Sequence, residues 1–107
     1  MLAVIFEVEI AENQNAQYFD TAAALRPLLD NIPGFISVER FQSLNKNNKY
    51  LSLSYWRDEE SIQQWRNTVQ HQEAQLLGRN GVFADYRLRV TAIIRDYGMY
   101  DREEMPT

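Results

Sequence analysis

Cysteine is absent from this 107-residue chain, and histidine occurs only once. The absence of cysteine excludes disulfide bonds, a thiolate nucleophile and thiolate metal ligands, and one histidine cannot form a multi-histidine zinc site. Basic residues are also few, because 11 Lys and Arg stand against 15 Asp and Glu, for a formal charge of -4. A domain that binds the phosphate backbone normally carries a basic surface, so we expect no nucleic-acid partner.

Long apolar runs are missing as well, and the first residues do not have the pattern of a secretory signal. No stretch approaches the roughly 20 apolar residues that a membrane-spanning helix needs, so we expect no membrane insertion. The first ten residues, MLAVIFEVEI, lack a basic region and a small-residue cleavage site, and they are typical of a strand. We therefore expect a cytoplasmic protein. The chain does contain 45% hydrophobic and 12% aromatic residues, which suits one globular domain with a single core.

The first half of the chain switches between two hydrophobic periods. Apolar residues at every second position from Leu2 to Ile10 predict a strand. Alternation over residues 35–44 and 49–56, around the polar turn NKNN, predicts a hairpin. Between these segments lies a helical stripe that should end at Pro33-Gly34; its members are Tyr18, Ala22, Leu25, Leu29 and Ile32.

The second half begins with two helix-start signals. Asp58 is positioned as an N-cap, and the acidic residues after it suit the positive end of a helix. Thr68 is positioned to cap a further helical stretch, VQHQEAQLL, that ends near Gly78 or Gly81. Alternation from Tyr86 to Ile94 then predicts a last strand. We expect one domain over residues 1–97, followed by an acidic C-terminal tail over 98–107.

This order of elements is that of the ferredoxin-like βαββαβ fold, an α+β class in which helices cover one face of a four-stranded antiparallel sheet. The usual strand order makes the first and last strands neighbours, so Glu7 and Glu9 are expected beside Arg87 and Arg89. Such pairs suit a solvated sheet face or one covered by a second subunit. Apolar residues on both faces favour the second subunit and hence a homodimer; they are Ile5, Ile36, Val38, Leu51, Leu53, Tyr55 and Ile93.

The chain resembles the antibiotic biosynthesis monooxygenase family over almost its whole length. The resemblance is carried by VIFEVEI, by IPGF before the second strand, by KYLSLSYWRDEESIQQW, by His71 six residues after the second Trp, and by YRLRV near the end. It implies a dimeric α/β barrel made of two ferredoxin-like subunits packed sheet to sheet. It also implies one of two activities, which are cofactor-independent oxidation of aromatic quinols to quinones with O2, or haem degradation.

For quinol oxidation the resemblance carries over in part. Trp56 corresponds to the Trp that lies near the substrate in quinol-oxidising members, while Ser52 stands where they carry an Asn proposed to hold a substrate oxygen, and Ile62 where they use a Tyr. We predict a cofactor-free monooxygenase that oxidises a small aromatic quinol or phenol with O2. Catalytic roles are expected for His71 and Trp56, and substrate contacts for Trp65, Ser52, Tyr18 and Phe6.

For haem degradation the ligand spacing is not met. Members with that activity need a helical Trp, an iron-binding His ten residues later and an Asn in the first strand. Trp65 matches the Trp, but Gln75 stands ten residues on, and the first strand offers Phe6 and Glu7. We therefore expect no metal or cofactor. A haem-binding protein and a noncatalytic, stress-associated small-molecule binding module are the alternatives.

The residues of the predicted site also have structural interpretations. If Thr68 caps a helix, His71 lies in its first turn, where the positive helix end favours the neutral imidazole that a general base requires. The alternative is an exposed or capping histidine without chemistry. Trp65 can belong to the core, and Tyr18 can reach water from a helix end.

Overall fold

The computed structural model describes residues 1–101, and residues 102–107 lie outside the described part. Four strands form one antiparallel sheet in the order β2-β3-β1-β4, so the first and last strands are neighbours, as predicted. Alternating apolar residues explain these strands, because alternate side chains face opposite sides of a sheet. Their bounds are β1 Leu2–Ile10, β2 Phe35–Gln42, β3 Lys49–Trp56 and β4 Phe83–Ala92.

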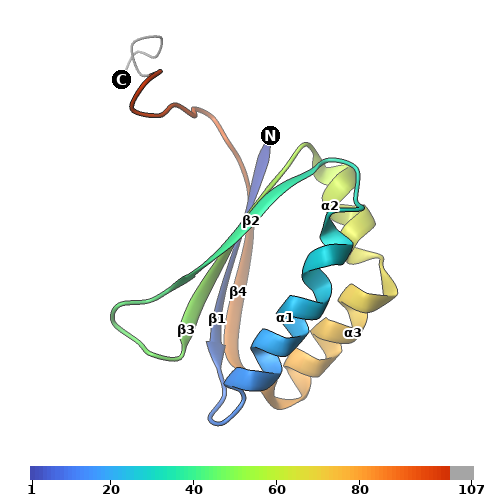
Figure 1. Ribbon diagram of the computed structural model, residues 1–107, viewed down its shortest axis with the longest axis vertical. Coiled ribbons are helices and arrows are strands. Elements are labelled where there is room, and N and C mark those ends of the chain that lie inside the picture. Colours follow the sequence, from blue (N-terminus) through green and yellow to red (C-terminus); the bar gives the residue numbers. More distant parts are fainter. Residues whose placement is uncertain (102–107) are drawn as a thin grey trace.

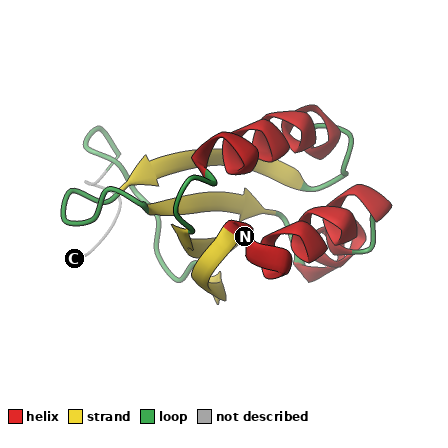
Figure 2. Ribbon diagram, turned by 90° about the horizontal axis from the view of Figure 1, so that it is seen from below, coloured by secondary structure: helices red, strands yellow, loops and turns green. Residues whose placement is uncertain are grey.

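All the helices lie on one side of this sheet (Figure 1 and Figure 2). They are α1 (Asn15–Leu29), α2 (Glu59–Arg66) and α3 (Val69–Leu77), which continues into a short irregular turn, η1 (Gly78–Val82), with a non-helical backbone at Gly81. The prediction of a ferredoxin-like α+β fold is therefore confirmed. Within residues 1–101, none of these helices is long and apolar enough to cross a membrane.

The end of α1 differs from the prediction. The helix ends at Leu29 and not at Pro33-Gly34, because the chain tightens into turns in which the Asn31 and Ile32 amides donate to the Leu28 and Leu29 carbonyls. Ile32 therefore leaves the helix, although its side chain still packs against the core.

Gly34 then redirects the chain into β2 with a φ of +91°, a left-handed conformation that glycine adopts without strain. Its carbonyl accepts a hydrogen bond from the Arg57 amide at 2.7 Å. Its Cα lies against Ser61, so that a Cβ built there would fall 1.9 Å from the Ser61 Oγ. The turn at Gly34 is thereby fitted closely to the start of α2.

Two capping side chains divide the second helical region, as the sequence predicts. Asp58 accepts a hydrogen bond from the Ser61 amide at 2.9 Å and from the Ser61 hydroxyl at 2.8 Å, and these bonds, with Arg57 beside them, lower the pKa of Asp58 to about 2. Thr68 accepts from the His71 amide at 3.2 Å and begins α3. The break between α2 and α3 therefore sets His71 in the first turn of a new helix.

β4 is displaced along the sequence from the predicted strand. It begins at Phe83 and ends at Ala92, whereas alternation predicted Tyr86 to Ile94. The strand starts early because η1 delivers the chain directly to the sheet edge, where Phe83 pairs with Ile10 across a register shift. Ile94 lies beyond the strand and is 93% exposed. Residues 93–101 run away from the sheet (Figure 1).

The side chains between sheet and helices form two apolar clusters. One surrounds Val8 and Ile10, which are 0% and 1% exposed, and includes Tyr18 and Val82. The other joins Trp56 and Trp65 to Leu29 and Ile62. The two clusters lie at opposite ends of the helix-covered face, and the candidate site lies between them.

The opposite face of the sheet carries both charge and apolar groups. Arg89 donates to Glu7 at 3.1 Å, which confirms one predicted pair between β1 and β4. Glu9 instead binds Lys46 at 2.8 Å, because β4 places Asp85 and not an arginine opposite it. By alternation with the helix-facing residues, this face also presents Ile5, Leu51, Leu53 and Tyr55.

The predicted division into a domain over 1–97 and a tail over 98–107 stays a prediction. Most of that tail, residues 102–107, lies outside the described residues.

Candidate active site

A cavity of about 420 Å³ lies between the helices and the sheet. Its floor comes from the helix-facing residues of the strands, and its roof comes from α1, α2, α3 and η1. All six residues predicted for the site line this cavity; they are Phe6, Tyr18, Ser52, Trp56, Trp65 and His71. The structure therefore brings together residues that are up to 65 positions apart in the sequence.

Trp56 closes one end of the cavity at the end of β3. Its side chain is 3% exposed, its ring packs edge-on against Phe35 at 5.2 Å, and its indole Nε1 donates to the Ser54 hydroxyl at 2.8 Å. A buried indole N–H requires such a partner, and Ser54 provides it from the same face of the same strand. Trp56 is both a core residue and a wall of the cavity.

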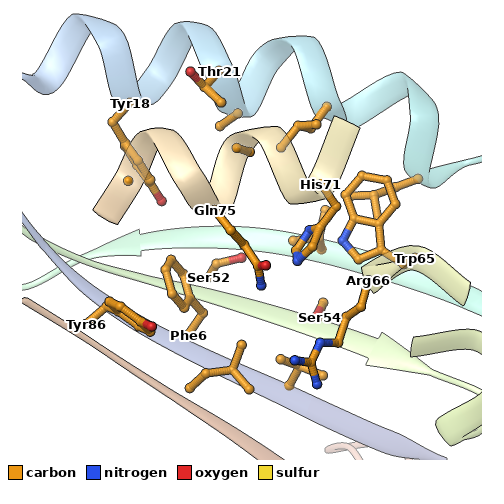
Figure 3. A pocket seen from close by; sticks show the side chains of 18 of the residues that line it. Phe6, Tyr18, Thr21, Ser52, Ser54, Trp65, Arg66, His71, Gln75 and Tyr86 are labelled. Carbon is orange, nitrogen blue, oxygen red and sulfur yellow. The ribbon is translucent and has the colours of Figure 1, made fainter. Parts of the chain in front are cut away.

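His71 faces the cavity from α3 and packs against Trp65, with ring centroids 5.2 Å apart (Figure 3). Burial lowers the pKa of His71 from its ordinary value of 6.5, and the charge of nearby Arg66 lowers it further. Both effects favour the neutral imidazole, the form that can accept a proton. The side chain is half-buried, so its role as a base does not conflict with access to a ligand.

Tyr18 is turned into the cavity from α1 and is not the water-exposed helix-end residue of the alternative interpretation, since it is only 7% exposed. Its hydroxyl accepts a hydrogen bond from the Arg40 Nε at 3.1 Å, and the Arg40 guanidinium carbon lies 5.4 Å from the centre of the ring. Phe6 and Tyr86, with centroids 5.9 Å apart, extend the aromatic lining across β1 and β4.

Cationic side chains line the cavity, and no Asp or Glu is among its lining residues. The cations are Arg26, Arg40, Arg66 and Arg79. Sequence patterns did not identify these arginines or Gln75 as site residues. The signal for Arg40 was present, because it lies two residues from Val38 on the same face of β2, but a charged residue at a strand position is usually solvated.

The cavity opens along β4. Tyr86, Leu88 and Val90 all line it, yet they are 49%, 45% and 42% exposed. The helices cover these side chains only in part, so they mark an opening of the cavity toward solvent.

The arrangement suits chemistry on a compact, largely apolar molecule. Aromatic and aliphatic walls exclude water, a neutral imidazole can take a proton, and hydroxyl and guanidinium groups can hold a polar atom. Of the side-chain types that commonly bind metals, only His71 lines the cavity. In residues 1–101 no group of three or more His, Cys, Asp or Glu side chains is placed to hold a metal ion.

Comparison with known proteins agrees with the α+β fold. The antibiotic biosynthesis monooxygenase family matches residues 1–76. Jasmonate monooxygenase ABM of Pyricularia oryzae is 49% identical over 98 residues, which are 89% of this chain and 46% of that protein, so the chain spans about half of this relative's length. The chain belongs to the antibiotic biosynthesis monooxygenase family.

Solved structures show the same fold at low identity. A putative antibiotic biosynthesis monooxygenase from Deinococcus radiodurans has a TM-score of 0.82 at 8% identity, covering 92% of this chain and 98% of that one. SnoaB, a cofactor-independent oxygenase from Streptomyces nogalater, has a TM-score of 0.77 at 12% identity, covering 89% and 94%. At 8% and 12% identity these likenesses show the shared fold.

Proposed function

We propose that the protein is a cofactor-independent monooxygenase that oxidises a small aromatic quinol or phenol with O2. The observation that carries the proposal is the half-buried His71, whose pKa is lowered by burial, facing an aromatic-lined cavity of about 420 Å³. A phenol becomes a good electron donor to O2 once it loses its proton. A base within a water-poor pocket is therefore the main group that the protein must supply.

The proposed reaction needs no external reductant for an anthrone-type substrate. His71 takes one of the two hydrogens of the reacting ring carbon as a proton, and the resulting enolate reduces O2 and combines with it at that carbon to give a hydroperoxide, which then loses water. One oxygen atom stays as the new carbonyl, and the other leaves as water with those two hydrogens. Trp56 and Trp65 hold the ring, and Ser52 or Tyr18 holds its oxygen.

A second candidate substrate comes from the relative named a jasmonate monooxygenase, which is 49% identical over 98 residues. A jasmonate-like keto acid has no phenol, so it would offer His71 a proton beside its ketone. Because the match covers only 46% of that relative, its substrate is a candidate here and no more.

Oxygen consumption tests the proposal without added metal or flavin. Anthrone, a naphthoquinol and jasmonate are each offered to the parent protein, to His71→Ala and to Gln72→Ala, which changes the exposed neighbour of His71. We expect His71→Ala to lower kcat by about 10²- to 10⁴-fold and Gln72→Ala to leave it unchanged. Full activity in His71→Ala would reject the base but keep the enzyme class. If no substrate is oxidised by the parent, the oxygenase proposal fails and the binding-module alternative becomes the better account.

Haem binding stays an alternative prediction with its own test. His71 lines the cavity and is a possible axial ligand, but the position ten residues after Trp65 carries the amide of Gln75. Haemin titration should give no Soret shift in the parent protein. A shift that is lost in His71→Ala would favour haem.

We also propose that the protein is a homodimer, with a second copy covering the sheet face opposite the helices. Ile5, Leu51, Leu53 and Tyr55 lie on that face, which no helix covers, and Phe41 there is 43% exposed. Light scattering should give about twice the 12.6 kDa mass of one chain at micromolar concentration. A monomer would reject the barrel. The cytoplasmic location stays a prediction.

A further inference from the structure

The charge of the cavity is opposite to that of the whole chain. The protein has a formal charge of -4, whereas the residues among 1–101 that line the cavity include four arginines and no Asp or Glu. An apolar cavity whose lining side chains carry positive charge favours a ligand that brings its own negative charge.

Two of the four arginines are already engaged within the protein. Arg26 binds Asp30 at 2.7 Å on the surface of α1, and Arg40 donates to Tyr18 and covers its ring. Arg79 belongs to the η1 turn, at the end of the cavity away from Trp65. These contacts leave Arg66 as the cation nearest to the proposed base.

Arg66 is the last residue of α2, and its guanidinium is turned into the cavity, as are the imidazole of His71 and the amide of Gln75 (Figure 3). Within residues 1–101 it forms no ion pair. Glu59 and Glu60 share a second hollow of about 360 Å³ with it, but neither carboxylate comes within 4.0 Å of its guanidinium.

We propose that the substrate carries a carboxylate, which binds Arg66 while the apolar body of the molecule fills the cavity. The planar guanidinium donates two parallel N–H groups to the two carboxylate oxygens, and the Gln75 amide is a further donor on the same side. This inference rests on the proposed function, because it names the substrate class for the same cavity. It holds for a phenolic acid and for a keto acid alike.

Binding of a matched pair of ligands tests the carboxylate directly. 1-Naphthaleneacetate and its neutral isostere 1-naphthaleneacetamide contain no oxidisable phenol, so calorimetric titration measures affinity without turnover. The parent protein should bind the acid more tightly than the amide by roughly tenfold, the effect of a charge-assisted hydrogen bond at a partly exposed site. The preference should shrink as salt is raised.

Variants assign that preference to one side chain. Arg66→Gln should abolish the preference for the acid and leave the affinity for the amide within about twofold, while Arg66→Lys should retain part of the preference because it keeps the charge. Arg79→Gln removes the same charge from the other end of the cavity and should keep the preference. Circular dichroism checks that each variant is folded.

The outcomes separate this inference from the proposed function. Equal affinity for acid and amide, loss of the preference in Arg79→Gln instead of Arg66→Gln, or no binding of either ligand below millimolar concentration would overturn the carboxylate subsite. Selective binding of acids by a protein that consumes no oxygen would keep the subsite and reject the oxygenase. Oxidation of a neutral quinol without selectivity for acids would support the oxygenase and reject the carboxylate subsite.

Discussion

Replacing Gly34 by alanine should destabilise the fold in two separable ways. The residue has a φ of +91°, where an L side chain is strained by about 1–3 kcal/mol. The new methyl group would also fall 1.9 Å from the Ser61 Oγ and 2.8 Å from the Ser61 Cβ. Rotating the hydroxyl away relieves the first contact but not the second, so the backbone of α2 must shift.

The size of the second effect follows from the packing around Ser61. This residue is 1% exposed, and its hydroxyl donates to the N-cap Asp58, so Ser61 has no free space into which it could move away from the new methyl group. Inserting a methyl group into a well-packed region costs about 1–3 kcal/mol. Together with the strain, Gly34→Ala should lower the free energy of unfolding by about 2–6 kcal/mol.

Gly81 provides a matched control, because its φ of +124° also strains an alanine while no atom lies within 4 Å of the new methyl group. Urea unfolding followed by tryptophan fluorescence should show a loss of only about 1–3 kcal/mol for Gly81→Ala. In a double-mutant cycle, Ser61→Gly should recover part of the loss caused by Gly34→Ala. Equal losses for the two glycine variants would refute the steric argument.

Three further predictions concern the site and the sheet. The folded-state pKa of His71 lies below its ordinary 6.5, so as the pH falls the unfolded chain binds this proton before the folded protein does. The free energy of unfolding should therefore decrease as the pH drops from about 7 toward 5. Urea titrations at each pH should show a smaller decrease for His71→Gln than for the parent protein. Trp56→Phe leaves the buried Ser54 hydroxyl without its donor and should lower the free energy of unfolding by about 1–2 kcal/mol. The KM for the oxidised substrate should also rise. Loss of all soluble protein would instead make Trp56 purely a core residue. Arg89→Glu sets a like charge beside Glu7, so the dissociation constant of a sheet-to-sheet dimer should rise at least about tenfold in sedimentation equilibrium. An unchanged dissociation constant would indicate that this pair lies on a solvated face.

The fold was largely predictable because it depends on local patterns that agree with one another. Alternation from Leu2 to Ile10 defines a strand whatever surrounds it, and the caps at Asp58 and Thr68 act within three residues along the chain. The end of α1 was missed because its last turn competes with a run of tighter turns, and the stripe through Ile32 is compatible with both. Helical spacing alone does not distinguish them.

The site was predictable on its apolar side and not on its charged side. Trp56 was predicted from the resemblance to quinol-oxidising proteins, and strand alternation is consistent with the helix-facing positions of Phe6 and Trp56. The direction of Arg66 depends instead on where α2 stops and α3 turns away, and that angle is a tertiary property. Glu9 shows the same limit, because its partner Lys46 comes from the hairpin loop and not from the neighbouring strand.

The open side of the cavity along β4 separates what keeps the protein folded from what a ligand meets on entry. Tyr86, Leu88 and Val90 touch the cavity while keeping between 42% and 49% of their surface in solvent, so replacing them removes a smaller share of buried surface than replacing Trp56, which is 3% exposed. Changes at these positions can reshape the entrance at a smaller cost in stability than changes at Trp56 or Ile62. Substitutions at these positions of β4 can therefore change substrate preference, while the buried residues elsewhere in the chain must be kept for folding.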